Sequence, residues 1–322
     1  MADKNHPRRG SLGYKPQRRA GRPYPQLTPP DEAAAGEPVG FAGYKAGMTR
    51  VLRVDDEYES PTKGQEVADA VTVVEVPPIA VYGIRAYGET AGGETPLTDV
   101  YADNISPDLE RAAVVPDSRT DTATLEERQD DISDIRLLVH TQPQQAGIGK
   151  KTPEVFELPI GGDAVDEKLD VATDLLGTEI AVSDVLDDGQ YIDTIGVTKG
   201  KGFEGPVKRH GIKTLSHKTQ KSNRKAGNIG PWHPDHTKWT VPQPGGTGYN
   251  KRTELNKRVL SISDDPSEVT PDSGFKNYGE VESTYLLVKG SVPGPAKRLI
   301  MLRPAARKDE YPENPEITHI ER

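Results

Sequence analysis

Residues 199–258 have almost no apolar periodicity, and this feature most constrains what the chain can fold into. The segment is broken by Gly and Pro, and it carries 14 Lys or Arg against 3 Asp or Glu. Its stretch KSNRKAGNIGPWHPDHTKW (221–239) holds both tryptophans of the protein, with hardly an aliphatic side chain to pack against them. Such a pattern predicts neither an amphipathic helix nor a half-buried strand. We expect an irregular loop, which at this length is usually functional or ordered by a partner.

Charge is divided into blocks along the chain. Residues 1–25 carry a net charge of +6 and residues 199–258 carry +11, whereas residues 51–198 carry -22 in a chain of net -9. The basic first block is dense in Gly, Pro and Arg, and is expected to form an extended arm. A single basic run can simply be a solvated surface. Two such blocks in an acidic chain indicate one surface for solvent and another for a polyanion.

Composition and hydropathy exclude several classes of protein. The chain has no cysteine, which excludes disulfides, thiolate zinc sites and thiol catalysis. The first 25 residues contain no apolar segment of a secretory signal. The longest apolar run, residues 71–82, is too short to span a bilayer. We therefore expect a soluble, cytoplasmic protein without a membrane partner.

Short runs rich in Val, Ile and aromatic residues predict a mainly β protein. A capping-box pattern at Thr124 and Glu127 predicts a helix through Ile132, Ile135 and Val139. A second, amphipathic helix is expected over residues 163–176, ending at Gly177. Strands are expected within residues 38–54, 67–87, 154–160, 178–183, 190–198, 258–263, 281–289 and 297–303.

The simplest architecture is an antiparallel β-barrel with a small α/β insertion and long irregular extensions. The predicted order along the chain is a basic N-terminal arm at 1–36, barrel segments at 37–89, 178–198 and 259–322, an acidic α/β insertion at 90–177, and a basic central loop at 199–258.

Two glycine-rich patterns could hold a phosphate, but both are incomplete. GKGFEG (200–205) matches G-x-G-x-x-G after a predicted strand, yet Pro206 and Gly211 follow and no βαβ unit does. GGTG (245–248) lacks the Lys-Ser/Thr step of a P-loop. We expect no cofactor, and expect these glycines to let the backbone turn and approach something closely.

Histidines of the central loop could form a metal site. His233 and His236 have H-x-x-H spacing, with His210 and His217 upstream, but Pro234 breaks the helix that would align the pair. No Ser/His/Asp pattern is present, and carboxylate pairs carry no weight in so acidic a chain. The sequence therefore predicts no metal, no small-molecule substrate and no enzyme.

Nucleic acid is the interpretation that remains. Lys and Arg neutralise phosphates, Gly and Pro keep the chain slim, and Trp, His and Tyr can stack on unpaired bases. The absence of a groove-fitting helix favours RNA over DNA. The candidate RNA contacts are cations and aromatic residues: Arg8, Arg9, Arg18, Arg19, Lys45, Lys199, Lys201, Lys208, Arg209, Lys213, His217, Lys218, Lys221, Arg224, Lys225, Trp232, His233, Lys238, Trp239, Tyr249, Lys251 and Arg252.

Six stretches, in order, resemble the universal large-subunit ribosomal protein three family in its archaeal and eukaryotic form. They are RRGSLGYKPQRRA (8–20), GFAGYKAGMTRV (40–51), VVEVPPIAVYGIRAY (73–87), GVTKGKGFEGPVKRHGIK (196–213), NIGPWHPDHTKWTVPQPGGTGYNKRTELNKRV (228–259) and KGSVPGPAKRLIMLR (289–303). The resemblance implies a translation-protein-like barrel on the outside of the large subunit, with the arm and loop reaching inward through 23S rRNA. It also implies neighbouring ribosomal proteins as partners, a role in nucleating assembly, and a loop tip at Trp232 near the A-site side of the peptidyl-transferase centre. The acidic excess departs from this usually basic family and is typical of a halophilic archaeon.

Two other functions stay open at this point. The barrel could serve an enzyme, although no nucleophile–base pair is present, or the chain could be a free RNA chaperone or regulator outside the ribosome. Sedimentation of a cell lysate at high ionic strength separates these alternatives, because only a structural component should stay with the large subunit.

Overall fold

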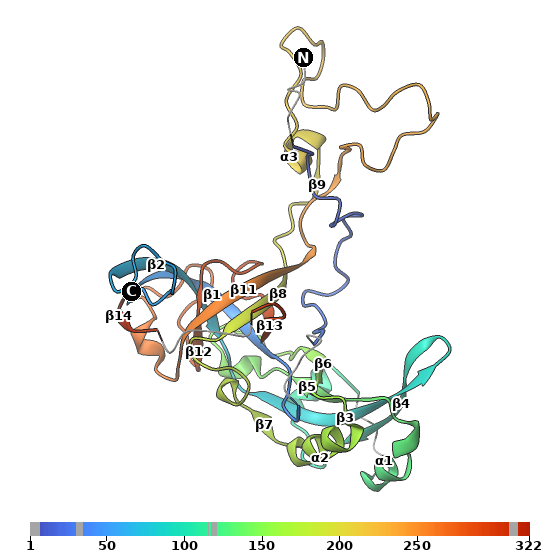
Figure 1. Cartoon of the computed structure of the whole chain (residues 1–322), viewed down its shortest axis with the longest axis vertical. Coiled ribbons are helices and arrows are strands. Elements are labelled where there is room, and N and C mark those ends of the chain that lie inside the picture. Colours follow the sequence, from blue (N-terminus) through green and yellow to red (C-terminus); the bar gives the residue numbers. More distant parts are fainter. Residues whose placement is uncertain (1–6, 30–34, 115, 117–120, 309–314) are drawn as a thin grey trace. The chain divides into compact units, whose positions relative to one another are not determined.

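The computed structural model describes residues 7–29, 35–114, 116, 121–308 and 315–322, and it divides into two compact units (Figure 1). The core unit comprises residues 24–196 and 252–322. The arm–loop unit comprises residues 1–23 and 197–251. No helix within the described ranges is long and apolar enough to cross a membrane.

A seven-stranded sheet forms the first layer of the core unit. Its strands are β1 (Phe41–Val54), β2 (Glu66–Glu75), β8 (Tyr191–Val197), β11 (Lys251–Ser263), β12 (Tyr285–Lys289), β13 (Leu299–Pro304) and β14 (Ile317–Ile320). Their order is β13-β8-β11-β12-β2-β1-β14, and β13 pairs with β1 as well as with β8. β1 and β2 pair antiparallel from Tyr44 opposite Glu75 to Val54 opposite Glu66. Every residue of β8 is buried, and this strand has a neighbouring strand on each side in the sheet.

A five-stranded sheet and one well-formed helix make up the rest of the core unit. Its strands are β3 (Ile79–Thr90), β4 (Gly93–Tyr101), β5 (Asp134–His140), β6 (Val155–Pro159) and β7 (Glu179–Ile180). The order is β4-β3-β5-β6, with β7 also paired to β3, so this sheet starts upstream of residue 90. The shorter helices are α1 (Ala123–Glu127) and the 3-10 turns η1 (Pro107–Arg111), η2 (Gln129–Asp131), η3 (Pro143–Gln145), η4 (Val182–Asp184) and η5 (Pro266–Glu268).

The helix α2 (Val165–Leu175) packs on β5 and β3 through one apolar face. Leu169 and Ala172 are buried there, at the three-residue spacing that places side chains on one side of a helix. The helix ends before Gly177, whose φ of +78° closes it in the left-handed region. The sequence-based prediction of this helix is confirmed.

One hydrophobic cluster runs through both sheets, and a buried carboxylate lies within it. Glu75 is fully buried and accepts hydrogen bonds from the backbone N–H groups of Glu282 (2.7 Å), Ser283 (2.9 Å) and Gly147 (3.2 Å). The Tyr278 hydroxyl donates to it as well, and burial together with Glu75 raises the pKa of that hydroxyl. These donors offset the cost of removing the carboxylate from water.

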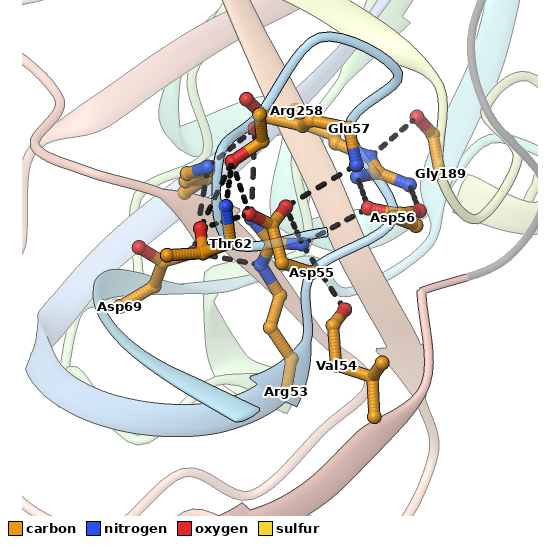
Figure 2. Close-up of polar contacts among 11 residues, drawn as sticks. Arg53, Val54, Asp55, Asp56, Glu57, Thr62, Asp69, Gly189 and Arg258 are labelled. Carbon is orange, nitrogen blue, oxygen red and sulfur yellow. Dashed lines mark hydrogen bonds and ion pairs between the residues drawn. The ribbon is translucent and has the colours of Figure 1, made fainter. Parts of the chain in front are cut away.

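The core unit pairs its own buried cations with carboxylates, as Figure 2 shows for Arg53 and Arg258. Both arginine residues are only 1% exposed. Arg53 donates to Asp69 (2.7 Å) and to Asp56 (2.9 Å), and Arg258 holds Asp56 through two hydrogen bonds of 2.6 and 2.5 Å. Further ion pairs in this unit involve Arg85, Arg136, Lys168, Lys289 and Arg303.

The chain is mainly β, as the sequence predicts, and the expected strand runs contain strands of the two sheets. The predicted helix through Ile135 and Val139 is wrong, because these residues lie in β5, which pairs with β3 and β6 on its two sides. Thr124 caps no helix there, since α1 ends at Glu127. β4 was not predicted. It is an edge strand containing Pro96, and such strands have a weak apolar signal.

Candidate nucleic-acid interface

The arm and the loop are joined at the base of the arm–loop unit by backbone and side-chain contacts. The N–H of Ala20 donates to the carbonyl of Tyr249 (2.7 Å). The guanidinium of Arg19 lies 5.3 Å from the centre of the Tyr249 ring, a cation–π contact. The buried Asn250 amide, in the orientation that satisfies its neighbours, donates to the carbonyl of Arg18 (2.7 Å). Two basic segments far apart in the sequence therefore form one unit.

Cations of the arm also bind backbone carbonyls of the loop. Each such bond gives a partner to a carbonyl that no regular element would satisfy. The pairs are Arg8 with Thr240 (3.1 Å), Arg9 with Gly211, and Lys15 with Trp239 (3.4 Å).

Short regular elements stabilise the stem of the loop: β9 (Phe203–Glu204), α3 (Pro206–His210) and β10 (Gly245–Gly246). β9 pairs antiparallel with β10. Arg209 joins α3 to this pair of strands, since it donates to the carbonyls of Gln243 (3.0 Å), Pro244 (3.3 Å) and Gly246 (3.1 Å). The prediction that residues 199–258 lack secondary structure is therefore wrong here and at the start of β11. The GKGFEG motif is followed by a helix of five residues only.

Positive charge is concentrated where the arm crosses α3. Burial, Arg8 and Arg209 lower the pKa of Lys15. Burial, followed by Lys15 and Arg209, lowers the pKa of His210. His210 is only 7% exposed, with a ring nitrogen against Gly10 of the arm. Within the described ranges no three His, Cys, Asp or Glu side chains are arranged to hold a metal ion.

Most cations of the arm–loop unit have no partner among the residues that the structure describes. Its sequence holds 18 Lys or Arg and 3 Asp or Glu, a net charge of +15, whereas the core unit holds the other 23 basic and 47 acidic residues, a net charge of -24. Ten predicted RNA contacts have exposed side chains with no hydrogen bond, ion pair or ring contact in the described part of the chain. We call these the ten free cations: Arg18, Lys199, Lys201, Lys208, Lys213, Lys218, Lys221, Arg224, Lys225 and Lys238.

The large aromatic residues of the loop face solvent. Trp232 is 88% exposed and Trp239 is 67% exposed, which confirms that neither indole belongs to a protein core. Trp239 lines a cleft together with Lys15 and Gln17 of the arm. Phe203 is 78% exposed, and the sequence analysis did not select it. A lone aromatic residue between glycines, as in GKGFEG, was the available signal.

The other predicted RNA contacts differ in whether their side chains already have a partner within the chain. Lys45 lies on β1 of the core unit, where its ammonium donates to the carbonyls of Val292 (2.7 Å) and Gly294 (3.3 Å). Lys251 and Arg252 begin β11 and have partners within the chain. His217 and His233 are exposed on the loop, outside its helices and strands.

Comparison with known proteins identifies the family. The model of the family described as ribosomal protein L3 matches residues 1–320. A relative from Halobacterium salinarum is 47% identical over 99% of this chain and 98% of its own length. Relatives from Methanothrix thermoacetophila and the halophile Haloarcula marismortui are 45% and 44% identical, with the same coverage of both chains. All three are called large ribosomal subunit protein uL3.

These matches define the chain as a ribosomal protein. It belongs to the ribosomal protein L3 family, in agreement with the resemblance seen in the sequence.

Proposed function

We propose that this chain is a structural constituent of the large ribosomal subunit and binds its 23S rRNA directly through the arm–loop unit. The observation that carries the proposal is the set of ten free cations in a unit of net charge +15. Exposed like charges repel one another, and the few carboxylates of this unit cannot neutralise them. The RNA backbone supplies the missing anion in a regular array.

The loop between α3 and β10 would reach deepest into the RNA. It carries Trp232, whose exposed ring and neighbouring Gly230 and Pro231 suit it to stacking or to filling an RNA crevice. By its resemblance to the family, we place the tip of this loop near the A-site side of the peptidyl-transferase centre. The protein would act there by shaping RNA, without a catalytic residue of its own.

The core unit would form a barrel that faces away from the RNA. Its pairings run β13-β8-β11-β12-β2-β1, and β1 pairs with β13 in turn, which supports closure of these six strands into a ring. The net charge of -24 on this unit disfavours contact with phosphates. We propose that it meets solvent and neighbouring large-subunit proteins, and that early binding of the other unit helps to nucleate subunit assembly.

Sedimentation tests the ribosomal role. A lysate centrifuged at high ionic strength should leave the chain with the large subunit. Recovery of the chain at the top of the gradient would instead indicate a free RNA chaperone or regulator.

Direct RNA binding needs its own experiment, with the full purified chain and a 23S rRNA transcript. The affinity should fall linearly with salt on logarithmic axes, because each bound phosphate releases counterions. An affinity independent of salt would contradict contact through the ten free cations.

A further inference from the structure

Phe203 and Gly246 lie directly opposite each other in the two-stranded β9–β10 sheet of the arm–loop unit. Residues paired in this way project toward the same face of a two-stranded sheet. One of them is a phenyl ring that is 78% exposed, and the other has no side chain. This face of the β9–β10 sheet therefore offers an aromatic ring beside an open space.

The two glycines of β10 differ in what the protein requires of them. A Cβ at Gly245 would lie 2.6 Å from the guanidinium of Arg209, so a side chain there would displace this guanidinium from its carbonyl partners. A Cβ at Gly246 would meet no atom within 4 Å, and Gly246 has no positive φ. No contact or backbone strain within the described chain explains this second glycine.

Cations lie close to Phe203 in the sequence and in the cleft that Gly246 lines. Lys201 and Lys208, on either side of Phe203 in the sequence, are two of the ten free cations. Gly246 also lines a cleft with Gly202 of the stem and with Gln17 and Arg19 of the arm. A ligand on the Phe203 ring would thus lie beside positive charge and against bare backbone.

We propose that Phe203 and Gly246 form a stacking site for one unpaired RNA base. The Phe203 ring supplies the stacking surface. Because Gly246 has no side chain, the base and its sugar can approach the backbone of β10. A single exposed phenylalanine is ordinary on protein surfaces. Here the facing glycine and the nearby lysines favour a nucleotide. An apolar protein partner would bury those lysines without a counter-charge, which is unfavourable.

The inference rests on the proposed RNA binding but can fail separately from it. Affinities of the full chain are measured for single-stranded poly(A) and for duplex poly(A)·poly(U), with the variants Phe203→Ala, Phe203→Tyr and Gly246→Val. Phe203→Ala should weaken poly(A) binding about 5- to 100-fold, the equivalent of one lost stack, and should not weaken duplex binding. The dependence on salt should keep its slope, because no phosphate contact is lost.

The other variants test the shape of the site. Phe203→Tyr keeps a ring and should bind poly(A) like the parent chain, whereas Gly246→Val fills the open face and should weaken poly(A) binding. The matched control is Gly92→Val in the core unit, since a Cβ at Gly92 would meet only the Thr90 hydroxyl, at 3.9 Å, and Gly92 has no positive φ. It should leave RNA binding unchanged.

Three results would overturn the inference. Equal affinity of Phe203→Ala and the parent chain for poly(A) would contradict the stacking site and leave the proposed function intact. An equal loss of single-stranded and duplex binding in Phe203→Ala would indicate that the β9–β10 pairing is distorted. Unchanged RNA affinity together with poor retention in the large subunit would assign Phe203 to a protein contact. A parent chain that binds neither RNA would refute the proposed function itself.

Discussion

In the core unit, Arg53 lies within 4 Å of four carboxylates, whereas Lys221 of the arm–loop unit has no carboxylate partner in the described part of the chain. The core unit is strongly acidic and still pairs most of its buried or half-buried cations internally. The arm–loop unit is strongly basic, and where its cations are engaged they bind backbone carbonyls, as Arg209 does. The core unit pairs its cations within the fold, whereas the arm–loop unit needs an external anion for its cations.

The largest expected effect lies in the core unit and concerns its folding. Arg53→Met should destabilise the chain by about 3–5 kcal/mol, because it leaves the buried Asp55 carboxylate without its counter-charge and removes the nearest cation from Asp69. Denaturant unfolding measures the change. The matched control is Arg50→Met, whose pair with Glu321 is largely exposed and should contribute about 0–1 kcal/mol. Equal losses for the two variants would show that burial does not distinguish these pairs.

A smaller effect, on binding alone, is expected in the arm–loop unit. Truncating Arg224 and Lys225 together to alanine should weaken rRNA binding, also at high salt, and reduce the salt slope by about 1.4–1.8. The unfolding midpoint should stay constant, since both side chains are exposed and unpaired in the described structure. Lys151→Ala with Lys276→Ala removes two exposed lysines of the core unit and is the matched control. An unchanged rRNA affinity after the Arg224 and Lys225 truncations would identify them as solvated charges.

The two tryptophans should differ in effect, although both are exposed. The Trp239 residue lines a cleft with Lys15 and Gln17 of the arm, so Trp239→Ala should loosen the arm and impair subunit assembly. Trp232→Ala should lose at most one stack, about 1–3 kcal/mol, which is small against the contacts of a whole ribosome. Trp232→Ala subunits should therefore assemble normally and show altered A-site tRNA binding and altered sensitivity to peptidyl-transferase inhibitors. Poor assembly with normal A-site function would show that Trp232 merely packs the loop.

The smallest expected effect concerns the pH dependence that Asp55 gives to the stability of the core unit. Hydrogen bonds from Ser60 and Thr62 lower the pKa of this carboxyl to about 2. A carboxyl with a lowered folded-state pKa contributes stability above its unfolded value, near pH 4, and loses it as pH falls toward 2. Asp55→Asn should therefore flatten the stability curve between about pH 4 and pH 2. Parallel curves for the two chains would contradict this origin of the acid sensitivity.

The sequence predicted best where neighbouring residues determine the outcome. The α2 helix shows its apolar face at helical spacing, and the run at 190–198 has the β-branched residues of β8. The prediction failed for β5, because Ile132, Ile135 and Val139 fit a helical period while the strand depends on partners far away in the chain. Pairing across such distances leaves no local signal.

The candidate interface was predictable in its composition but not in its detailed roles. The clustered lysines are visible in the sequence itself, and the lack of apolar neighbours predicts that the tryptophans are exposed. The sequence could not show that Arg209 and Arg9 use their guanidinium groups on carbonyls of the loop, because these contacts exist only once the arm and loop are packed. Phe203 was missed for a similar reason, since its significance depends on Gly246 lying opposite.

The most direct test of the contrast between the two units replaces all ten free cations with glutamine and measures rRNA affinity across a range of salt concentrations. The parent chain and the variant are compared at equal temperature and pH, and thermal unfolding of both is recorded. The account predicts that the salt slope falls by about seven, at about 0.7 for each phosphate no longer neutralised, while the unfolding midpoint does not fall. An unchanged slope, or a loss of stability as large as that of Arg53→Met, would contradict the claim that these cations serve RNA rather than the fold.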